Sequence, residues 1–212
     1  MPMRIDRFDP RRSAVIVVDM QHDFIAPGAA LETPMGRALF PKLKQLLDRA
    51  RSAGMRIIYT AHVHRRDGSD LGSFGEIWSS IGEGAALVDG EPGVEVVGDV
   101  APLPGELIIK KHRYSAFFGT DLDMVLRNGD IENVVITGVT TENCCHATAR
   151  DAMFHGYRVA FISDATGTFD YPDAGFGAIP APEVHRVSLG ILGVSTAHVM
   201  DTDEFVARID AG

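Results

Sequence analysis

One stretch of this chain, residues 133–153, restricts the possible folds more than any other. Residues 134–136 are β-branched and predict a short buried strand. The strand ends at Gly138, and an alanine-rich segment of helical character follows without a polar linker. A strand that passes through a sharp turn into a helix is the repeating unit of α/β proteins, so this stretch favours that fold class.

Cys144 lies in the first turn of the predicted helix, which Thr141 or Asn143 is expected to cap. Backbone N–H groups without helical partners and the positive end of the helix dipole meet at this turn, and both favour thiolate over thiol. The same N–H groups are suited to an oxyanion formed when a thiolate attacks a carbonyl. Cys144 is therefore the candidate nucleophile.

Strands and helices alternate along the rest of the chain. This pattern predicts one domain, residues 1–212, in which helices cover both faces of a six-stranded, mostly parallel, Rossmann-like sheet: a three-layer α/β/α fold. Residues 65–105 show no strong period and predict a long loop with short pieces of structure, of the kind that usually serves as a functional lid or contact surface. The expected strands are 13–20, 55–60, 107–110, 134–138, 158–163 and 194–200, and the expected helices are 36–53, 120–128, 141–155, 183–192 and 203–209.

Chemically useful side chains follow the ends of these strands. In parallel α/β sheets, ligands bind outside the carboxyl ends of the strands, where the strand order reverses. The fold is therefore expected to gather such residues along one edge: Asp19, His62, His64, Lys111, Cys144 and Asp164.

Composition excludes several classes of function. The net charge of −9 argues against nucleic acid or an anionic membrane as the main partner. There is no run of 18 apolar residues and no apolar signal-peptide core near the start, so we expect no membrane association. The two cysteines, Cys144 and Cys145, are adjacent and unsuited to a structural disulfide, which favours a reducing, cytoplasmic location.

Three motifs give the chain a family resemblance. They are Val-Val-Asp-Met-Gln-His-Asp-Phe at 17–24, Lys-His-Arg-Tyr-Ser-Ala-Phe at 111–117 and Gly-Val-Thr-Thr-Glu-Asn-Cys at 138–144. In this order they resemble the isochorismatase-like cysteine hydrolases, which include N-carbamoylsarcosine amidases, ureidoacrylate or biuret hydrolases and nicotinamidases. With the sheet pattern, the resemblance covers roughly residues 12–207.

The resemblance implies a catalytic triad of Asp19, Lys111 and Cys144. It also implies a cis peptide between Val139 and Thr140, with the backbone N–H groups of Thr140 and Cys144 forming an oxyanion hole. In such a site the cysteine attacks a carbonyl, the carboxylate carries its proton and the ammonium group orients both. No cofactor is expected.

Two choices among neighbouring residues depend on the register of the motifs. Lys110 and Lys111 point to opposite sides of an extended chain, and the motif selects Lys111, which leaves Lys110 in solvent. Nicotinamidases carry Asp-x-His and a further histidine where this chain has Thr60-Ala-His62-Val-His64, so the aspartate is missing. Without the carboxylate these histidines make a poor metal site, so we expect no metal there and a lower preference for nicotinamide.

The substrate pocket is expected to use residues close to the three motifs. Arg113 is a candidate partner for a substrate carboxylate, although a structural ion pair is an equal alternative. Asp164, His146 and His155 are expected to be structural, and Cys145 to be a buried apolar residue. The expected pocket residues are Phe24, His62, Trp78, Arg113, Tyr114 and Phe117.

Together these features predict a metal-free cysteine amidohydrolase that cleaves a C–N bond in a small amide, carbamoyl or ureido compound. The alternatives are a vinyl-ether hydrolase of the isochorismate type, which needs no cysteine, and a redox-sensing or non-catalytic thiol module. The resemblance also implies a homodimer or homotetramer, with residues 71–86 as the candidate contact surface. Substrate specificity is assigned to loops 22–35, 62–90 and 166–182.

Overall fold

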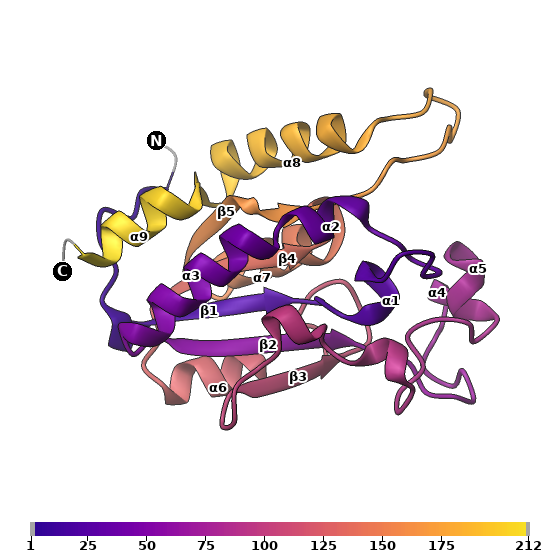
Figure 1. Ribbon diagram of the computed structural model, residues 1–212, viewed down its shortest axis with the longest axis horizontal. Helices are drawn as coiled ribbons and strands as arrows, with labels where there is room; N and C mark the ends of the chain where they lie inside the picture. Colours follow the sequence, from indigo (N-terminus) through magenta and orange to yellow (C-terminus); the bar gives the residue numbers. More distant parts are fainter. Residues whose placement is uncertain (1–2, 211–212) are drawn as a thin grey trace.

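A computed structural model describes residues 3–210 and places a six-stranded, fully parallel sheet at the centre of the molecule (Figure 1). The strand order is β3-β2-β1-β4-β5-β6. From β1 the chain adds β2 and β3 on one side of the sheet; it then returns to the centre and adds β4, β5 and β6 on the other side. The strands are β1 (Ser13–Val18), β2 (Arg56–His62), β3 (Leu107–Lys111), β4 (Asn133–Val139), β5 (Arg158–Gly167) and β6 (His198–Met200).

Helices cover both faces of this sheet. Side chains of α3 (Phe40–Ser52) and α9 (Thr202–Asp210) belong to the hydrophobic cluster on one face. Side chains of α6 (Leu122–Asn128), α7 (His146–Phe154) and α8 (Ala181–Ser195) belong to the cluster on the other. The predicted three-layer α/β/α fold is therefore confirmed.

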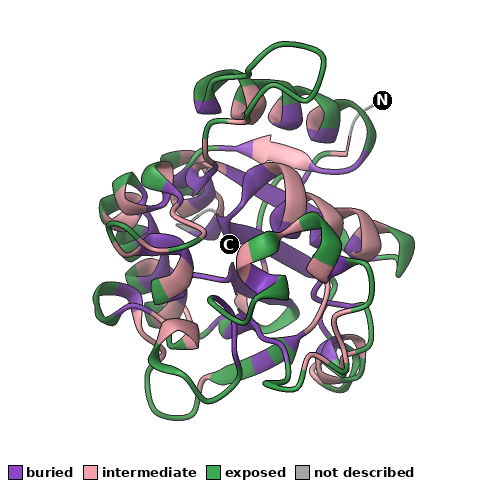
Figure 2. Ribbon diagram, turned by 90° about the vertical axis from the view of Figure 1, so that its right-hand side faces the viewer, coloured by how far each residue is buried: buried purple, intermediate pink, exposed green. Residues whose placement is uncertain are grey.

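The central strand β1 shows why the sheet is buried on both sides. Val15 and Val17 belong to one hydrophobic cluster, whereas Ala14, Ile16 and Val18 belong to the other, and all five are fully buried. Successive strand residues point to opposite faces, so a continuous apolar run supplies both cores. Figure 2 shows the same buried interior from the end of the molecule toward which the strands run.

Short helices gather at that end of the sheet (Figure 1). They are α1 (His22–Ile25), α2 (Pro34–Ala38), α4 (Phe74–Ile77) and α5 (Ser79–Gly82). The region predicted as a long loop contains α4, α5 and two 3-10 turns, Pro92–Val94 and Gly98–Val100, and a third such turn, Pro10–Arg12, precedes β1. Within residues 3–210, no helix is both long and apolar enough to cross a membrane.

Some predicted boundaries were wrong. The helix expected over 36–53 is two helices, because Pro41 fits only the first turn of α3. β5 continues past Ser163 to Gly167. Residues 194–195, expected in the last strand, complete α8 instead, because an apolar run of this length suits a helix end as well as a strand.

The two ends of the described chain meet at the opposite end of the molecule from the short helices (Figure 1). The Phe8 N–H donates to the Arg208 carbonyl oxygen at 3.1 Å, and the rings of Phe8 and Phe205 meet edge to face at 5.1 Å. The first residues and α9 therefore pack as one unit.

Candidate active site

Asp19 immediately follows β1 and is fully buried. Its backbone lies in the left-handed region, with φ of 51°, which turns the chain sharply at the end of the strand. Thr60 of the neighbouring β2 donates its hydroxyl to Asp19 Oδ1 at 2.6 Å and accepts the Asp19 N–H at 3.2 Å. This double contact fixes the carboxylate at the edge of the sheet.

Lys111 is the last residue of β3, and its side chain is fully buried. Its Nζ lies 2.7 Å from Asp19 Oδ2, 3.3 Å from Cys144 Sγ and 3.0 Å from the Arg113 carbonyl oxygen. Three polar partners match the three N–H groups of an ammonium ion. Lys110 instead points outward and pairs with Asp89 at 2.7 Å, so the choice of Lys111 over Lys110 agrees with the structure.

Cys144 follows β4 through a short π-helical turn, Thr141–Cys145. The peptide bond between Val139 and Thr140 is cis, as the resemblance implied. The expected cap was wrong: Thr140 occupies the N-cap position and makes no side-chain cap bond. The turn closes through the Cys145 N–H and the Thr140 carbonyl oxygen at 3.1 Å, a spacing of five residues that side-chain patterns do not indicate.

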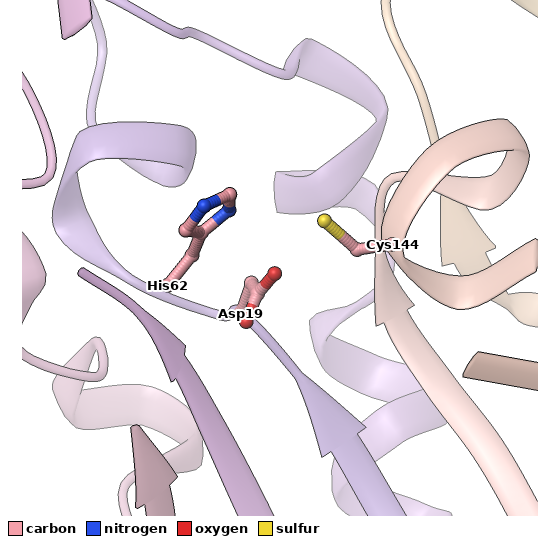
Figure 3. A group of neighbouring side chains, drawn as sticks. All are labelled: Asp19, His62 and Cys144. Atoms are coloured by element: carbon pink, nitrogen blue, oxygen red, sulfur yellow. The ribbon is translucent and has the colours of Figure 1, made fainter. Parts of the chain in front are cut away.

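The fold brings Asp19, Lys111 and Cys144 together at the point where the strand order reverses, between β1 and β4. His62, the last residue of β2, joins them. A carboxylate oxygen of Asp19, a ring nitrogen of His62 and Cys144 Sγ lie within 4.8 Å of one another. Figure 3 shows these three side chains converging from separate segments of the chain.

Burial and charge set the protonation of this cluster. Burial raises the pKa of the Cys144 thiol; Lys111 opposes this effect, but the charge of Asp19 and its hydrogen bond to the thiol reinforce it, and the pKa stays above its usual range. Burial alone lowers the pKa of Lys111, but the Asp19 carboxylate 2.7 Å away opposes this effect, and the pKa stays raised.

These shifts correct the expectation of a sulfur that rests as a thiolate. A buried site that held Asp19 and Cys144 both ionised against one ammonium ion would carry a net negative charge, which burial disfavours. A neutral thiol leaves one carboxylate and one ammonium ion, which balance. The resting cluster is therefore a neutral thiol beside the ion pair of Asp19 and Lys111.

A cavity of about 330 Å³ opens above the cluster. Four of the predicted pocket residues line it: Phe24, His62, Trp78 and Tyr114. Thr140, which precedes the π turn, and Asn143, which lies within it, form part of the lining and place the cavity beside Cys144.

Two predicted pocket residues are not part of the cavity lining. Arg113 turns away from it: its guanidinium donates to the His112 carbonyl oxygen at 2.5 Å and to the Asp70 carbonyl oxygen at 3.0 Å. Phe117 is buried in the core beneath α7 and stacks on His155 with ring centroids 5.1 Å apart. Adjacency to Lys111 in sequence does not set the direction of these side chains.

Other residues that the sequence suggested as structural do have structural contacts. Asp164 accepts hydrogen bonds from the backbone and the hydroxyl of Thr202 at 2.8 and 2.7 Å, which begins α9. Cys145 is fully buried, is not in a disulfide and directs its sulfur to the Thr137 carbonyl oxygen at 3.7 Å.

Sequence reasoning missed several residues of the site. Thr60 was detectable, because it is the last residue of the expected strand 55–60, and the carboxyl ends of parallel strands lie at the same edge of the sheet as Asp19. Phe74, at the start of α4, and Phe169, shortly after β5, line the cavity and carry no periodic signal. Asn143 was considered only as a cap; it lines the cavity and donates to the Tyr171 hydroxyl at 2.9 Å.

Among residues 3–210, two groups of side chains have the spacing of metal ligands: Asp19, His62 and Cys144, and a second group near the cavity, His64, Asp70 and His112. In the first group, the Lys111 ammonium already lies against both the carboxylate and the sulfur, and a cation added there would meet its charge. In the second, His112 Nδ1 lies 2.7 Å from the Val63 carbonyl oxygen, a contact that requires a proton on that nitrogen. Neither donor set fits a metal ion as it stands.

A parallel α/β sheet with a cysteine, a carboxylate and a lysine at its reversal point defines a cysteine hydrolase of the α/β class. Comparisons with known proteins agree. The family model of the isochorismatase domain matches residues 13–204, and the chain therefore belongs to the isochorismatase-like family of cysteine hydrolases.

Individual relatives support this membership. A cysteine hydrolase from Pseudomonas syringae pv. phaseolicola 1448A is 37% identical and superposes with a TM-score of 0.95, over 100% of this chain and 98% of that one. An N-carbamoylsarcosine amidase from Thermoplasma acidophilum is 28% identical, with a TM-score of 0.70 over 91% and 97% of the two chains. A protein from Arabidopsis thaliana named "probable inactive nicotinamidase" is 31% identical over 202 residues, 93% of this chain and 97% of its own length.

Proposed function

We propose that this hydrolase cleaves the C–N bond of a small amide, carbamoyl or ureido compound through a thioester on Cys144. The observation that carries the proposal is the position of the Lys111 ammonium, 2.7 Å from the Asp19 carboxylate and 3.3 Å from the Cys144 sulfur, beside a cavity of substrate size. This geometry supplies a nucleophile, a base and an orienting cation in one contact network.

The first half of the proposed reaction forms the acyl-enzyme. Asp19 accepts the Cys144 proton as the sulfur bonds to the carbonyl carbon, and the carbonyl electrons move onto oxygen. The backbone N–H groups of Thr140 and Cys144 are proposed to stabilise that oxyanion. When the intermediate collapses, the C–N bond breaks, and Asp19 returns its proton to the leaving nitrogen.

The second half releases the acyl group. Water attacks the thioester carbonyl while Asp19 accepts a proton from it, and the C–S bond breaks. The proton then returns to the sulfur, which restores the thiol and leaves the carboxylic or carbamic acid as product. Lys111 stays protonated throughout and stabilises whichever of its two neighbours is negative.

Cys144→Ser and Cys144→Ala test this proposal. Both are expected to lose ammonia or amine release by at least about 1,000-fold, because the nucleophile is gone. Mass spectrometry of the wild-type protein quenched during turnover is expected to show one acyl group on Cys144. Full turnover by either variant would contradict the mechanism, and turnover of isochorismate by the alkylated protein would favour the vinyl-ether alternative.

We also propose a homodimer or homotetramer in the cytoplasm. Residues 71–86, the candidate contact surface, include α4 and α5, and Ile77 within them is 62% exposed. Light scattering is expected to give at least twice the monomer mass for the wild-type protein. The Ile77→Glu variant is expected to give a mass closer to that of the monomer. A stable and active monomer would contradict this proposal.

A further inference from the structure

We infer that the substrate is uncharged and carries an aromatic or compact apolar group beside its scissile amide, and that the site rejects carboxylate-bearing relatives such as N-carbamoyl amino acids. The inference rests on the proposed function, and it concerns the side of the substrate that does not react. Three features support the inference. The cavity has an aromatic lining, the nearby arginine and lysine side chains already have partners, and acidic residues lie at the cavity.

The cavity lining combines polar groups with a larger set of apolar and aromatic side chains; besides the polar residues near the reacting cluster it includes Glu32, Ser79 and Ser80. His62, Thr140 and Asn143 lie toward Cys144, where an amide would react. The remaining walls are largely apolar and contain five aromatic rings: Phe24, Phe74, Trp78, Tyr114 and Phe169. Aromatic walls of this kind favour a flat or branched apolar group.

Contacts among the rings hold the aromatic part in shape. Trp78 Nε1 donates to the Tyr114 hydroxyl at 3.0 Å, and the Trp78 ring meets Phe169 edge to face with centroids 6.1 Å apart. The rings of Phe74 and Tyr114 lie 4.8 Å apart. Segments from the 62–90 loop, the end of β3 and the 166–182 loop therefore form one preformed wall.

None of the described residues that line the cavity is an arginine or a lysine. The buried Lys111 below it has its three polar partners already and offers no free N–H to a substrate carboxylate. Arg113 donates to two backbone carbonyl oxygens and places its guanidinium over the Phe74 ring, 5.6 Å from the centroid.

Arg37 is also occupied. It pairs with Glu32 at 2.6 Å and donates to the Ile25 carbonyl oxygen at 2.9 Å. Glu32 lines the cavity, and Asp19 lies at its reacting end, so the fixed acids of the site are of the same sign as a substrate carboxylate. A carboxylate bound here would lose its hydration without gaining a cation.

His62 does not supply the missing positive charge. Burial lowers its pKa well below the usual value, and the nearby Lys111 charge adds to the effect. Its Nε2 is buried and has no hydrogen-bond partner within residues 3–210. A neutral imidazole in this position is suited to an uncharged amide group rather than to an anion.

Matched pairs of compounds test the inference by binding and by turnover. Phenethylurea is N-carbamoylphenylalanine without its carboxylate, and propionamide is succinamic acid without its carboxylate. Calorimetric titration into Cys144→Ser protein measures binding without chemistry, and ammonia release by the wild-type protein measures turnover. Each neutral compound is expected to bind, and to react, at least about 100-fold better than its acid.

Variants locate the selectivity in the cavity. Leu31→Arg adds a cation to the lining and is expected to narrow the neutral-to-acid ratio by about tenfold or more. Leu103→Arg, at a 53% exposed position outside the lining, adds the same charge and is expected to leave the ratio unchanged. Trp78→Ala is expected to weaken phenethylurea about tenfold while methylurea, which has no ring, changes little.

The outcomes separate this inference from the proposed function. Equal or tighter binding of the acids, or of a cationic analogue, by the Cys144→Ser protein would overturn the inference, as would no measurable binding of phenethylurea. If the neutral compounds bind selectively but the wild-type protein releases no ammonia and forms no acyl-enzyme, the inference holds and the proposed amidohydrolase function is wrong.

Discussion

At the scale of single residues, the contact between Asp19 and Lys111 joins two fully buried charges. Removing one partner of such a pair leaves the other unpaired in the interior, which is far more costly than removing both. An intact pair is therefore needed for the stability of the folded protein, whether or not the pair itself adds to it.

Lys111→Met is expected to lower the free energy of unfolding by about 3–5 kcal/mol, because it leaves Asp19 buried without a cation. The double variant Asp19→Asn/Lys111→Met is expected to recover most of that loss, yet neither protein is expected to release ammonia. Denaturant titration and an ammonia assay measure the two effects. A single variant as stable as the wild type would contradict the prediction.

Cys144 is expected to titrate as a thiol of raised pKa. Because burial and the Asp19 charge disfavour the thiolate, the neutral form persists through neutral pH and the thiolate appears only in alkali. The difference in thiolate absorbance between wild type and Cys144→Ser, followed against pH, measures this directly. A thiolate signal complete below about pH 8, under the usual cysteine value, would contradict it.

At the scale of elements, the join between β4 and the π turn depends on Gly138. Its φ is 103°, a region that side chains disfavour, and a Cβ there would lie 2.1 Å from the Val18 carbonyl oxygen of β1. The strand that leads to Cys144 therefore approaches β1 too closely for any other residue.

Gly138→Ala is expected to destabilise the protein by about 3 kcal/mol or more and to abolish ammonia release, since β4 must move away from β1. Gly190→Ala in α8 is the matched control. Gly190 is exposed and has nothing within 4 Å of its added Cβ, so the change is expected to stabilise by about 0.5–1 kcal/mol. Thermal unfolding compares the stability of the Gly138→Ala and Gly190→Ala variants. Equal changes in stability would refute the requirement for glycine at position 138.

The sequence predicted the strands well because their apolar runs are long and buried on both faces, as in β1. It predicted the meeting of Asp19, Lys111 and Cys144 because parallel strands place their carboxyl ends together. It missed the direction of Arg113, which depends on backbone carbonyls of a loop without periodic pattern. The protonation of Cys144 was also missed, since burial becomes visible only in three dimensions.

At the scale of the whole molecule, several histidines are held neutral by their surroundings. Burial lowers the pKa of His62, His64, His146, His185 and His198. One contact requires this: His198 Nδ1 accepts the Ile5 N–H at 3.0 Å, so it must be unprotonated. The folded protein therefore binds fewer protons than the unfolded chain below the ordinary histidine pKa.

The free energy of unfolding is consequently expected to be greatest above about pH 6.5, the ordinary histidine pKa. It is expected to fall as the pH drops from there toward the lowered histidine pKa values of the folded protein. Each fully buried histidine such as His62 contributes a slope of at most about 1.4 kcal/mol per pH unit. Urea titrations near pH 7.5 and pH 5.5 measure the loss, and His198→Gln is expected to reduce it. Stability that stays level between those values would disprove the linkage.

The packing of the first residues against α9 has a practical consequence. The Phe8 N–H donates to the Arg208 carbonyl oxygen of α9, and α9 lies at the end of the molecule opposite the short helices α1, α4 and α5 (Figure 1). A bead, surface or fusion partner attached to a residue beside Phe8 or on α9 should therefore leave the cavity mouth open to small solutes. Immobilised enzyme is expected to retain the turnover of the free form.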